Sequence, residues 1–170
     1  MVFRRDYWHS PMGVLLTDAL RSITGTEISF FPAWRYGATL LPGKITVEDV
    51  YGLVPSRGRI ITYSMSGKAV RQLMENILDG VVDVDPYARV GGDMIQFSGM
   101  DLVYDLDNPR GERVVSLSVE GEPMNLEKLY SVASVHTRFQ NNPLFGAQHV
   151  EETDQVFVEA LIDFIRIHSP

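Results

Sequence analysis

The stretch "RIITYSMSGKAVRQLMENILDG", residues 59–80, carries the strongest structural signal in the chain. Its first part, residues 59–66, is rich in β-branched and aromatic residues and predicts a strand. From Gly67 the spacing changes to that of a helix with one apolar and one polar face. The apolar face holds Val70, Leu73, Met74, Ile77 and Leu78, and the polar face holds Lys68, Arg71, Gln72, Glu75 and Asn76. The stretch therefore predicts a strand followed by an amphipathic helix that stops at Gly80.

Two further helices are predicted before this unit. Ser10 followed by Pro11 is a capping hydroxyl with proline in the first turn, and Gly25 is a typical helix stop. Residues 27–31 predict a buried strand. Thr46 then predicts the start of a short helix through Tyr51, with Asp49 placed to complete a capping box.

The second half of the chain predicts mainly strands. Residues 81–99 lack a sustained period and predict a long loop that ends in a short strand. Residues 101–107, 113–121 and 129–135 predict an antiparallel meander, with turns at 108–111 and 121–123. Residues 136–154 predict a polar loop before a last amphipathic helix, whose inner face holds Phe157, Leu161, Phe164 and Ile165. We therefore expect one α+β domain over residues 1–170, a mixed or antiparallel sheet with flanking helices.

Composition excludes some classes of function. The 170 residues carry a formal net charge of -7, spread along the chain rather than gathered in blocks. Proteins that bind nucleic acid or membrane surfaces are usually basic, so neither partner is expected. There is no cysteine, which rules out disulfides and thiol nucleophiles. No apolar run approaches the roughly 20 residues that span a bilayer.

The sequence contains no complete catalytic or metal-binding set. His9, His136, His149 and His168 lack the spacing of a metal site and are better explained as surface residues. Asp83 and Asp85 alternate before Pro86 and could present two carboxylates to a cation or for acid–base work, but a solvated loop edge explains them better. No serine lies in a G-x-S-x-G elbow. We expect no catalytic residue, metal or cofactor in this chain.

Arginines near turns are the more informative feature. Arg35, Arg57, Arg59 and Arg89 lie close in sequence to aromatic residues, and arginine beside an aromatic ring can hold an anionic or planar ligand. For most of them a surface ion pair is the simpler explanation. Arg35 differs because the stretch "FPAWRYGATLLPG", residues 31–43, is otherwise apolar, and an arginine there needs an anionic or planar partner.

The order of these motifs resembles the C-terminal domain of the 5′-nucleotidase family. The resemblance rests on "TDAL" (17–20), "EISFFPAWRYGATLLPGKIT" (27–46), "SGKAVRQLMEN" (66–76), "GGDMIQFSGMDLVYD" (91–105) and "LYSVAS" (129–134), and it runs from about Arg4 to the last helix. Within the family the chain looks most like the SoxB-type thiosulfohydrolases of bacterial sulfur oxidation. That likeness lies in "RRDYWH" at the start, "AWRYGATLLPG" and "DPYARVGGDM" (85–94).

The resemblance implies a substrate-binding role. Members of the family join this domain to an N-terminal metallophosphoesterase domain with two metal ions, manganese or zinc, and this chain has no counterpart of those motifs. The substrate-binding residues implied here are Arg35, Tyr36, Gly37, Tyr87, Gly91, Gly92 and Asp93. In the nucleotidases two aromatic rings clamp the base. Here Asp93 stands where the first ring is expected and "NNPLFGAQ" (141–148) replaces the motif near the second, which disfavours nucleotide binding.

Three functions are therefore kept open. The first is the substrate-binding half of a SoxB-like hydrolase, which releases sulfate from a cysteine S-thiosulfonate on a sulfur-carrier protein and is periplasmic. The second is the C-terminal domain of a 5′-nucleotidase-type nucleotide phosphohydrolase. The third is a stand-alone interaction domain without catalysis. The partner implied is a metallophosphoesterase domain, in the same or a separate chain. The first of the three functions also implies a sulfur-carrier protein.

Overall fold

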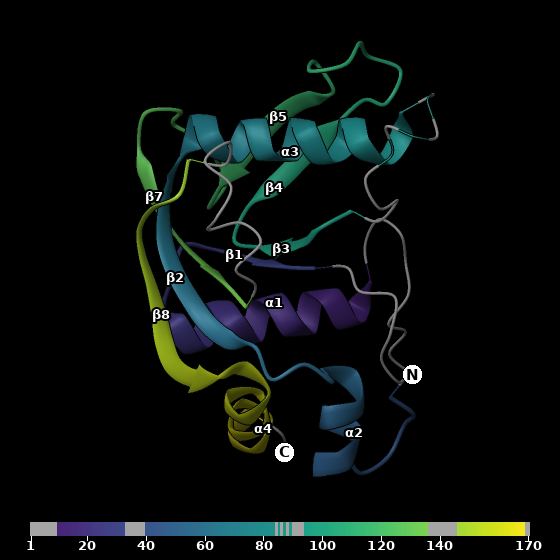
Figure 1. The fold of residues 1–170 in the computed structure, drawn as a ribbon, viewed down its shortest axis with the longest axis vertical. Coiled ribbons are helices and arrows are strands. Elements are labelled where there is room, and N and C mark those ends of the chain that lie inside the picture. Colours follow the sequence, from purple (N-terminus) through teal and green to yellow (C-terminus); the bar gives the residue numbers. More distant parts are fainter. Residues whose placement is uncertain are drawn as a thin grey trace.

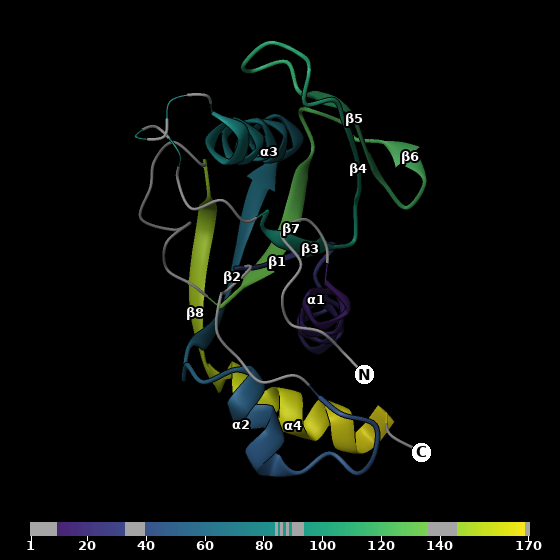
Figure 2. The same ribbon diagram turned by 90° about the vertical axis from the view of Figure 1, so that its right-hand side faces the viewer.

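A computed structural model describes residues 10–32, 40–83, 85, 87, 89, 94–135 and 146–168 (Figures 1 and 2). The helices are α1 (Pro11–Thr24), α2 (Val47–Leu53), α3 (Gly67–Val82) and α4 (Phe157–His168). The strands are β1 (Ile28–Phe31), β2 (Arg59–Ser66), β3 (Gln96–Ser98), β4 (Asp101–Tyr104), β5 (Val114–Val119), β6 (Glu122–Pro123), β7 (Leu129–Ser134) and β8 (Gln148–Val156). The α+β class predicted from the sequence is confirmed.

A five-stranded sheet in the order β3-β1-β7-β2-β8 separates two apolar clusters. Because side chains alternate along a strand, Ile61, Tyr63 and Met65 of β2 join one cluster while Ile60 joins the other. The first cluster is completed by α3 and the smaller sheet, and the second by α1, α2 and α4. Figure 1 shows α3 and α1 on opposite sides of the sheet.

The smaller sheet has the order β4-β5-β6 and is antiparallel. It is joined to the larger sheet through Gly99, which lies between β3 and β4 with a φ of 88°. A Cβ at this position would stand 2.0 Å from the carbonyl oxygen of Glu27, so only glycine fits. The bend at Gly99 thus requires a residue without a Cβ as much as it requires the positive φ.

The helix ends follow the sequence signals closely. Ser10 caps α1 by accepting a hydrogen bond from the Gly13 amide at 2.8 Å, and Gly25 ends that helix in the left-handed conformation. Thr46 and Asp49 form the predicted capping box, with the Thr46 amide donating to Asp49 Oδ2 at 2.7 Å. In the part of the chain that the structure describes, no helix is long and apolar enough to cross a membrane.

The predicted meander is wrong at its third strand. β7 leaves the smaller sheet and lies between β1, which runs parallel to it, and β2, which runs antiparallel. Its side chains are buried on both faces, with Tyr130 and Val132 in one cluster and Ala133 in the other. Such a strand suits the centre of a sheet rather than an edge. The third strand of the smaller sheet is β6, after a turn at Glu120 and Gly121 with positive φ values.

The predicted polar loop at 136–154 is also wrong in part, because β8 begins at Gln148. Nearly all of its side chains are exposed, so it lacks the apolar alternation by which a strand is recognised. Backbone hydrogen bonds to β2 hold this strand in place. The pairing register shifts between Arg59 and Ile61 and again between Thr62 and Ser64. Residues 136–145 lie outside the described part of the chain.

Helix α3 departs from its prediction in two respects. It continues past Gly80 to Val82, and Glu75, assigned to the polar face, is only 3% exposed. The Glu75 carboxylate accepts hydrogen bonds at 2.9 Å from the amides of Arg113 and Val114. Asp79, one turn further on, pairs with Arg113. These two acids attach α3 to the start of β5, where the backbone amides would otherwise be unsatisfied.

This arrangement predicts that Glu75→Ala destabilises the fold strongly. The change leaves two amides without their charged acceptor, and we expect a loss of about 3 kcal/mol in the free energy of unfolding. Gln72→Ala is the matched control, because Gln72 lies on the same helix with its amide bonded only to exposed Asn76. Denaturant unfolding measures both. Equal losses in the two variants would contradict the role given to Glu75.

Candidate functional site

The ends of four strands meet along one end of the larger sheet. Phe31, the last residue of β1, is paired with Gln96, the first residue of β3. Because β1 and β7 are parallel, with Ser29 beside Ala133, the last residues of β7 lie at this same end. Antiparallel β2 begins there, with Ile61 opposite Ser134. Pro32, Met94 and Val135, which adjoin 33–39, 90–93 and 136–145, are thus brought to this end of the sheet, whereas Gly146 lies at the other end, beside Ala69 at the start of α3.

The first turn of α1 lies at the same end of the sheet. Gln96, which is 4% exposed, accepts a hydrogen bond from the Ser10 amide at 3.1 Å and donates one to the Met94 carbonyl at 3.1 Å. Its side chain fills the space beside Gly13, where an added Cβ would stand 2.1 Å from Gln96 Oε1. In Figure 1 the start of α1 and the end of β1 both lie toward the right. Gln96 therefore fixes the first turn of α1 to this end of the sheet.

Most of the predicted site residues lie outside the described residues. This holds for Arg35, Tyr36, Gly37, Gly91, Gly92 and Asp93, whose site assignment remains a prediction. Tyr87 is described and 96% exposed, with its amide bonded to Asp85 Oδ1 at 2.9 Å. The pairing of β1 with β3 places the residues before 33 beside those after 93. The strand register is therefore compatible with a shared site for the two groups.

The other arginines singled out from the sequence are occupied by structural partners. Arg57 pairs with Glu159 of α4 at 2.7 Å. Arg59 pairs with Asp154 of β8 at 3.2 Å and lies 3.8 Å from Glu152. These are the surface ion pairs that the sequence analysis expected for most of its arginines, and they attach α4 and the edge strand β8 to the start of β2.

The aspartates at 83 and 85 also have structural partners. Asp83 Oδ1 accepts the Asp85 amide at 3.0 Å, while Oδ2 lies 3.4 Å from Arg110. Arg89 donates to the Asp83 carbonyl at 2.7 Å. Among residues with described placement, no three histidines or acids are grouped so that they could hold a metal ion. The two carboxylates thus shape the turn after α3 and pair with Arg110.

The remaining histidines with a described position are exposed. His149 lies in β8 with a φ of 52°. His168 ends α4, where its ring stacks on Phe164 with the centroids 4.1 Å apart and its Nδ1 lies 2.8 Å from the Phe164 carbonyl oxygen. Among the described residues, neither imidazole forms an ion pair or hydrogen bond with a carboxylate. His9 and His136 fall outside the described residues.

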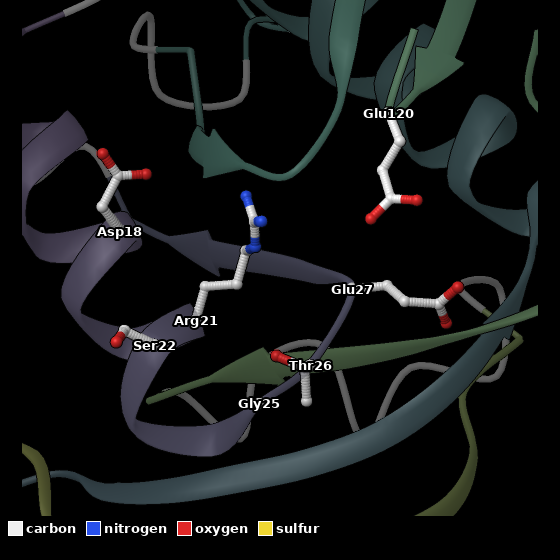
Figure 3. A pocket seen from close by; sticks show the side chains of 7 residues that line it. All are labelled: Asp18, Arg21, Ser22, Gly25, Thr26, Glu27 and Glu120. Carbon is white, nitrogen blue, oxygen red and sulfur yellow. The ribbon is translucent and has the colours of Figure 1, made fainter. Parts of the chain in front are cut away.

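A polar pocket that the sequence analysis missed lies at the opposite end of α1 and β1 (Figure 3). It has a volume of ≈ 540 Å³ and is lined by Asp18, Arg21, Ser22, Gly25, Thr26, Glu27 and Glu120. Six of these residues come from the second half of α1 and the short connection to β1, and Glu120 comes from the turn between β5 and β6. No sequence motif marks the pocket, because only the packing of the two sheets brings Glu120 to the helix.

Two of the pocket's carboxylates have fixed partners. Asp18 accepts a hydrogen bond from the Ser98 hydroxyl. Glu27 accepts bonds from Lys128 Nζ at 2.6 Å and from the Ser131 amide at 2.9 Å. Burial alone would raise the pKa of Glu27, but the hydrogen bonds from Lys128 and Ser131 outweigh it and lower that pKa below 4.5. The hydrogen bond to Glu27 in turn raises the pKa of Lys128 above 10.5.

The fold is an α+β domain with a five-stranded mixed sheet and a three-stranded antiparallel sheet. A sequence profile for "5'-nucleotidase, C-terminal domain" matches residues 3–148. The chain therefore belongs to the 5′-nucleotidase C-terminal domain family.

Curated relatives share about half of the chain. A snake venom 5′-nucleotidase from Macrovipera lebetinus is 32% identical over 98 residues, which is 53% of this chain and 22% of that protein. The NAD 5′-nucleotidase of Haemophilus influenzae is 30% identical over 111 residues, which is 57% of this chain and 17% of that protein. The chain thus spans less than a quarter of the length of these relatives.

Solved structures match nearly the whole chain. Sulfate thiohydrolase SoxB from Thermus thermophilus, in complex with glycerol, superposes with a TM-score of 0.84 at 26% identity, covering 98% of this chain and 31% of SoxB. A 5′-nucleotidase precursor, also from Thermus thermophilus, gives 0.74 at 24% identity, covering 96% of this chain and 33% of that one. The latter shows the fold alone.

The Glu27–Lys128 pair predicts a pH window for the stability of the sheet where β1 and β7 begin. Because the folded-state pKa of Glu27 is lowered, its contribution is complete above 4.5 and is lost as the pH falls through the folded value. Because that of Lys128 is raised, its contribution is complete below 10.5 and is lost as the pH rises through the folded value. Lys128→Met should therefore melt at a lower temperature than the original chain inside this window.

Melting curves across the pH range measure this difference. It should shrink toward zero on the acid side as Glu27 becomes protonated. Lys44→Met is the control, since Lys44 is exposed and takes part in no ion pair with a described residue. A difference that stays constant down to strongly acidic pH would contradict an electrostatic origin and point to lost packing on Tyr130, whose ring centroid lies 4.6 Å from Lys128 Nζ.

Proposed function

We propose that this chain is the substrate-binding half of a SoxB-like hydrolase, which releases sulfate from a cysteine S-thiosulfonate on a carrier protein. The observation that carries the proposal is the likeness to SoxB over 98% of the chain, with a TM-score of 0.84 against 0.74 for a nucleotidase structure. The motifs at 31–43 and 85–94 support the same branch of the family. The sulfur chemistry goes beyond family membership and rests on this likeness.

The reaction divides naturally between two domains. The oxygen of a water molecule bonds to the sulfur of the terminal sulfonate, and the bond between that sulfur and the next sulfur breaks. Sulfate leaves together with one proton, and the other proton goes to the persulfide that remains on the carrier. Metal ions that activate such a water would be held by a metallophosphoesterase domain, as the family resemblance implies. Within the described residues of this chain no group of three or more histidines or acids is placed to hold a metal ion.

This chain would hold the sulfonate and the carrier peptide. A guanidinium offers two parallel hydrogen bonds to sulfonate oxygens, and Arg35 is the arginine that the sequence leaves in apolar surroundings. Gly91 and Gly92 would let a peptide backbone approach closely, with Tyr36, Gly37, Tyr87 and Asp93 beside them. The strand ends that flank these segments lie at one end of the sheet, and this supports a shared site.

A second candidate is a nucleotide phosphohydrolase. The curated relatives favour it, since a snake venom 5′-nucleotidase and a bacterial NAD 5′-nucleotidase are at least 30% identical to parts of the chain. Against it stands the sequence around the two expected stacking rings, where Asp93 and "NNPLFGAQ" (141–148) replace the nucleotidase pattern. The ligand that the isolated chain binds therefore separates the two candidates.

The first test replaces Arg35. Arg35→Ala should weaken binding of a short peptide that carries cysteine S-thiosulfonate by about 1.5–3 kcal/mol, the value of a hydrogen bond to a charged group. Arg35→Lys should restore only part of the affinity, because lysine lacks the planar fork. Calorimetric titration gives the affinities, with the reduced peptide as the ligand control.

The matched protein control is Arg166→Ala, since Arg166 is exposed on α4 and pairs only with Asp163. It should bind the peptide as the original chain does. A sharp fall in melting temperature for Arg35→Ala, with unchanged affinity in what remains folded, would show that Arg35 is a structural residue and would contradict its place in the site.

The second test uses nucleotides as ligands. We expect AMP and NAD to bind the chain with dissociation constants weaker than about 1 mM, because the two stacking rings are not where the nucleotidase pattern puts them. Titration calorimetry under the conditions of the peptide experiment measures this directly. Binding in the micromolar range would favour the nucleotide phosphohydrolase over the thiosulfohydrolase.

A further inference from the structure

Arg21 is unusual among the arginines with a described position. The other seven, Arg57, Arg59, Arg71, Arg89, Arg110, Arg113 and Arg166, each donate to a carboxylate or a carbonyl. No described residue forms an ion pair or side-chain hydrogen bond with the Arg21 guanidinium, although three carboxylates line the same pocket. The side chain is only partly exposed, so water does not surround it fully.

Glu120 is the pocket's second charged side chain without a hydrogen bond to a described residue, and it is exposed, with a negative charge that helps to raise the pKa of Lys128. It forms no hydrogen bond or ion pair with any described residue. Its φ of 53° is a conformation that glycine and asparagine adopt more readily, so glutamate is a poor choice for the turn itself. Figure 3 shows the Arg21 guanidinium and the Glu120 carboxylate pointing into the same space from facing sides.

The charges of the pocket select one kind of ligand. A simple anion would meet three carboxylates, and a simple cation would meet the guanidinium. A small zwitterion meets neither difficulty, because its carboxylate can take the two parallel hydrogen bonds of Arg21 while its ammonium group faces Glu120. The volume of ≈ 540 Å³ lies within the range of roughly 300–1,000 Å³ that is common for small-molecule sites.

We propose that this pocket binds the zwitterionic backbone of a free α-amino acid, with its carboxylate on Arg21 and its ammonium group on Glu120. Glu27 forms one wall of the pocket, where Lys128 and Ser131 hold its carboxylate in place. The site is separate from the substrate site proposed above. The 14 residues of α1 span about 21 Å between the two ends of the helix, and the pocket lies at the far one.

The test is a titration of the ¹⁵N-labelled chain with L-alanine, followed by NMR. Saturable shifts are expected in the amides of Ser22, Thr26, Glu27 and Gly121, with a dissociation constant on the order of millimolar, as suits a ligand of this size. Acetate and ethylamine each carry one of the two charges and should bind at least about tenfold more weakly.

Two variants assign the contacts. Arg21→Gln keeps the Cβ and Cγ methylenes but removes the guanidinium, and Glu120→Asn removes the carboxylate while suiting the positive φ of the turn. Each should abolish the saturable shifts without lowering the melting temperature. Arg166→Gln and Glu122→Gln, which change exposed groups away from the pocket lining, should bind L-alanine as before.

The proposal is overturned by any of three results. One is the absence of saturable shifts with L-alanine. Another is equal binding of acetate or ethylamine, which would make the pocket a site for a single charge. The third is L-alanine binding that survives Arg21→Gln or Glu120→Asn in a folded chain, which would place the amino acid elsewhere.

Discussion

The register of β1 against its two neighbours is the constraint on which the rest of the structure depends. β1 is only four residues long, yet it pairs with β3 on one side and with β7 on the other. These pairings bring together residues that are far apart in the sequence and set which chain segments leave the sheet at the same end. A one-residue slip would exchange the two faces of β1 and move Phe30 out of its cluster.

Polar side chains at the contacts between elements then fix the positions of the helices and of the two sheets relative to one another, which strand pairing alone does not determine. Gln96 attaches α1 to β3, Glu75 and Asp79 attach α3 to β5, and Glu27 attaches β1 to β7. In each case a side chain satisfies backbone amides or a charged partner at the place where two elements meet. Apolar packing is tolerant of small shifts, whereas these bonds are directional, so they fix the relative positions of the two sheets and of α1.

The elements that the sequence predicts well are those whose signals are local. Capping residues, proline and glycine predict where α1 and α2 begin or end. An apolar stripe at helical spacing predicts α3 and α4. β8 has no such signal, because an exposed edge strand is held by backbone pairing rather than by an apolar face. The burial of Glu75 depends on amides 38 and 39 residues away, which no local pattern contains. The pocket around Arg21 was missed for the same reason.

The distribution of arginine partners bears on where an anionic substrate could bind. At the end of the sheet where β1 and β7 finish, Arg57 and Arg59 are neutralised by acids of α4 and β8. A guanidinium already paired with a carboxylate binds a sulfonate weakly, because the sulfonate would have to displace that carboxylate. Arg89, further along, gives its Nε to a backbone carbonyl. In the function proposed above, positive charge for a substrate at this end would come from other residues, and Arg35 is the proposed source because its apolar sequence neighbours provide no acid to pair with it.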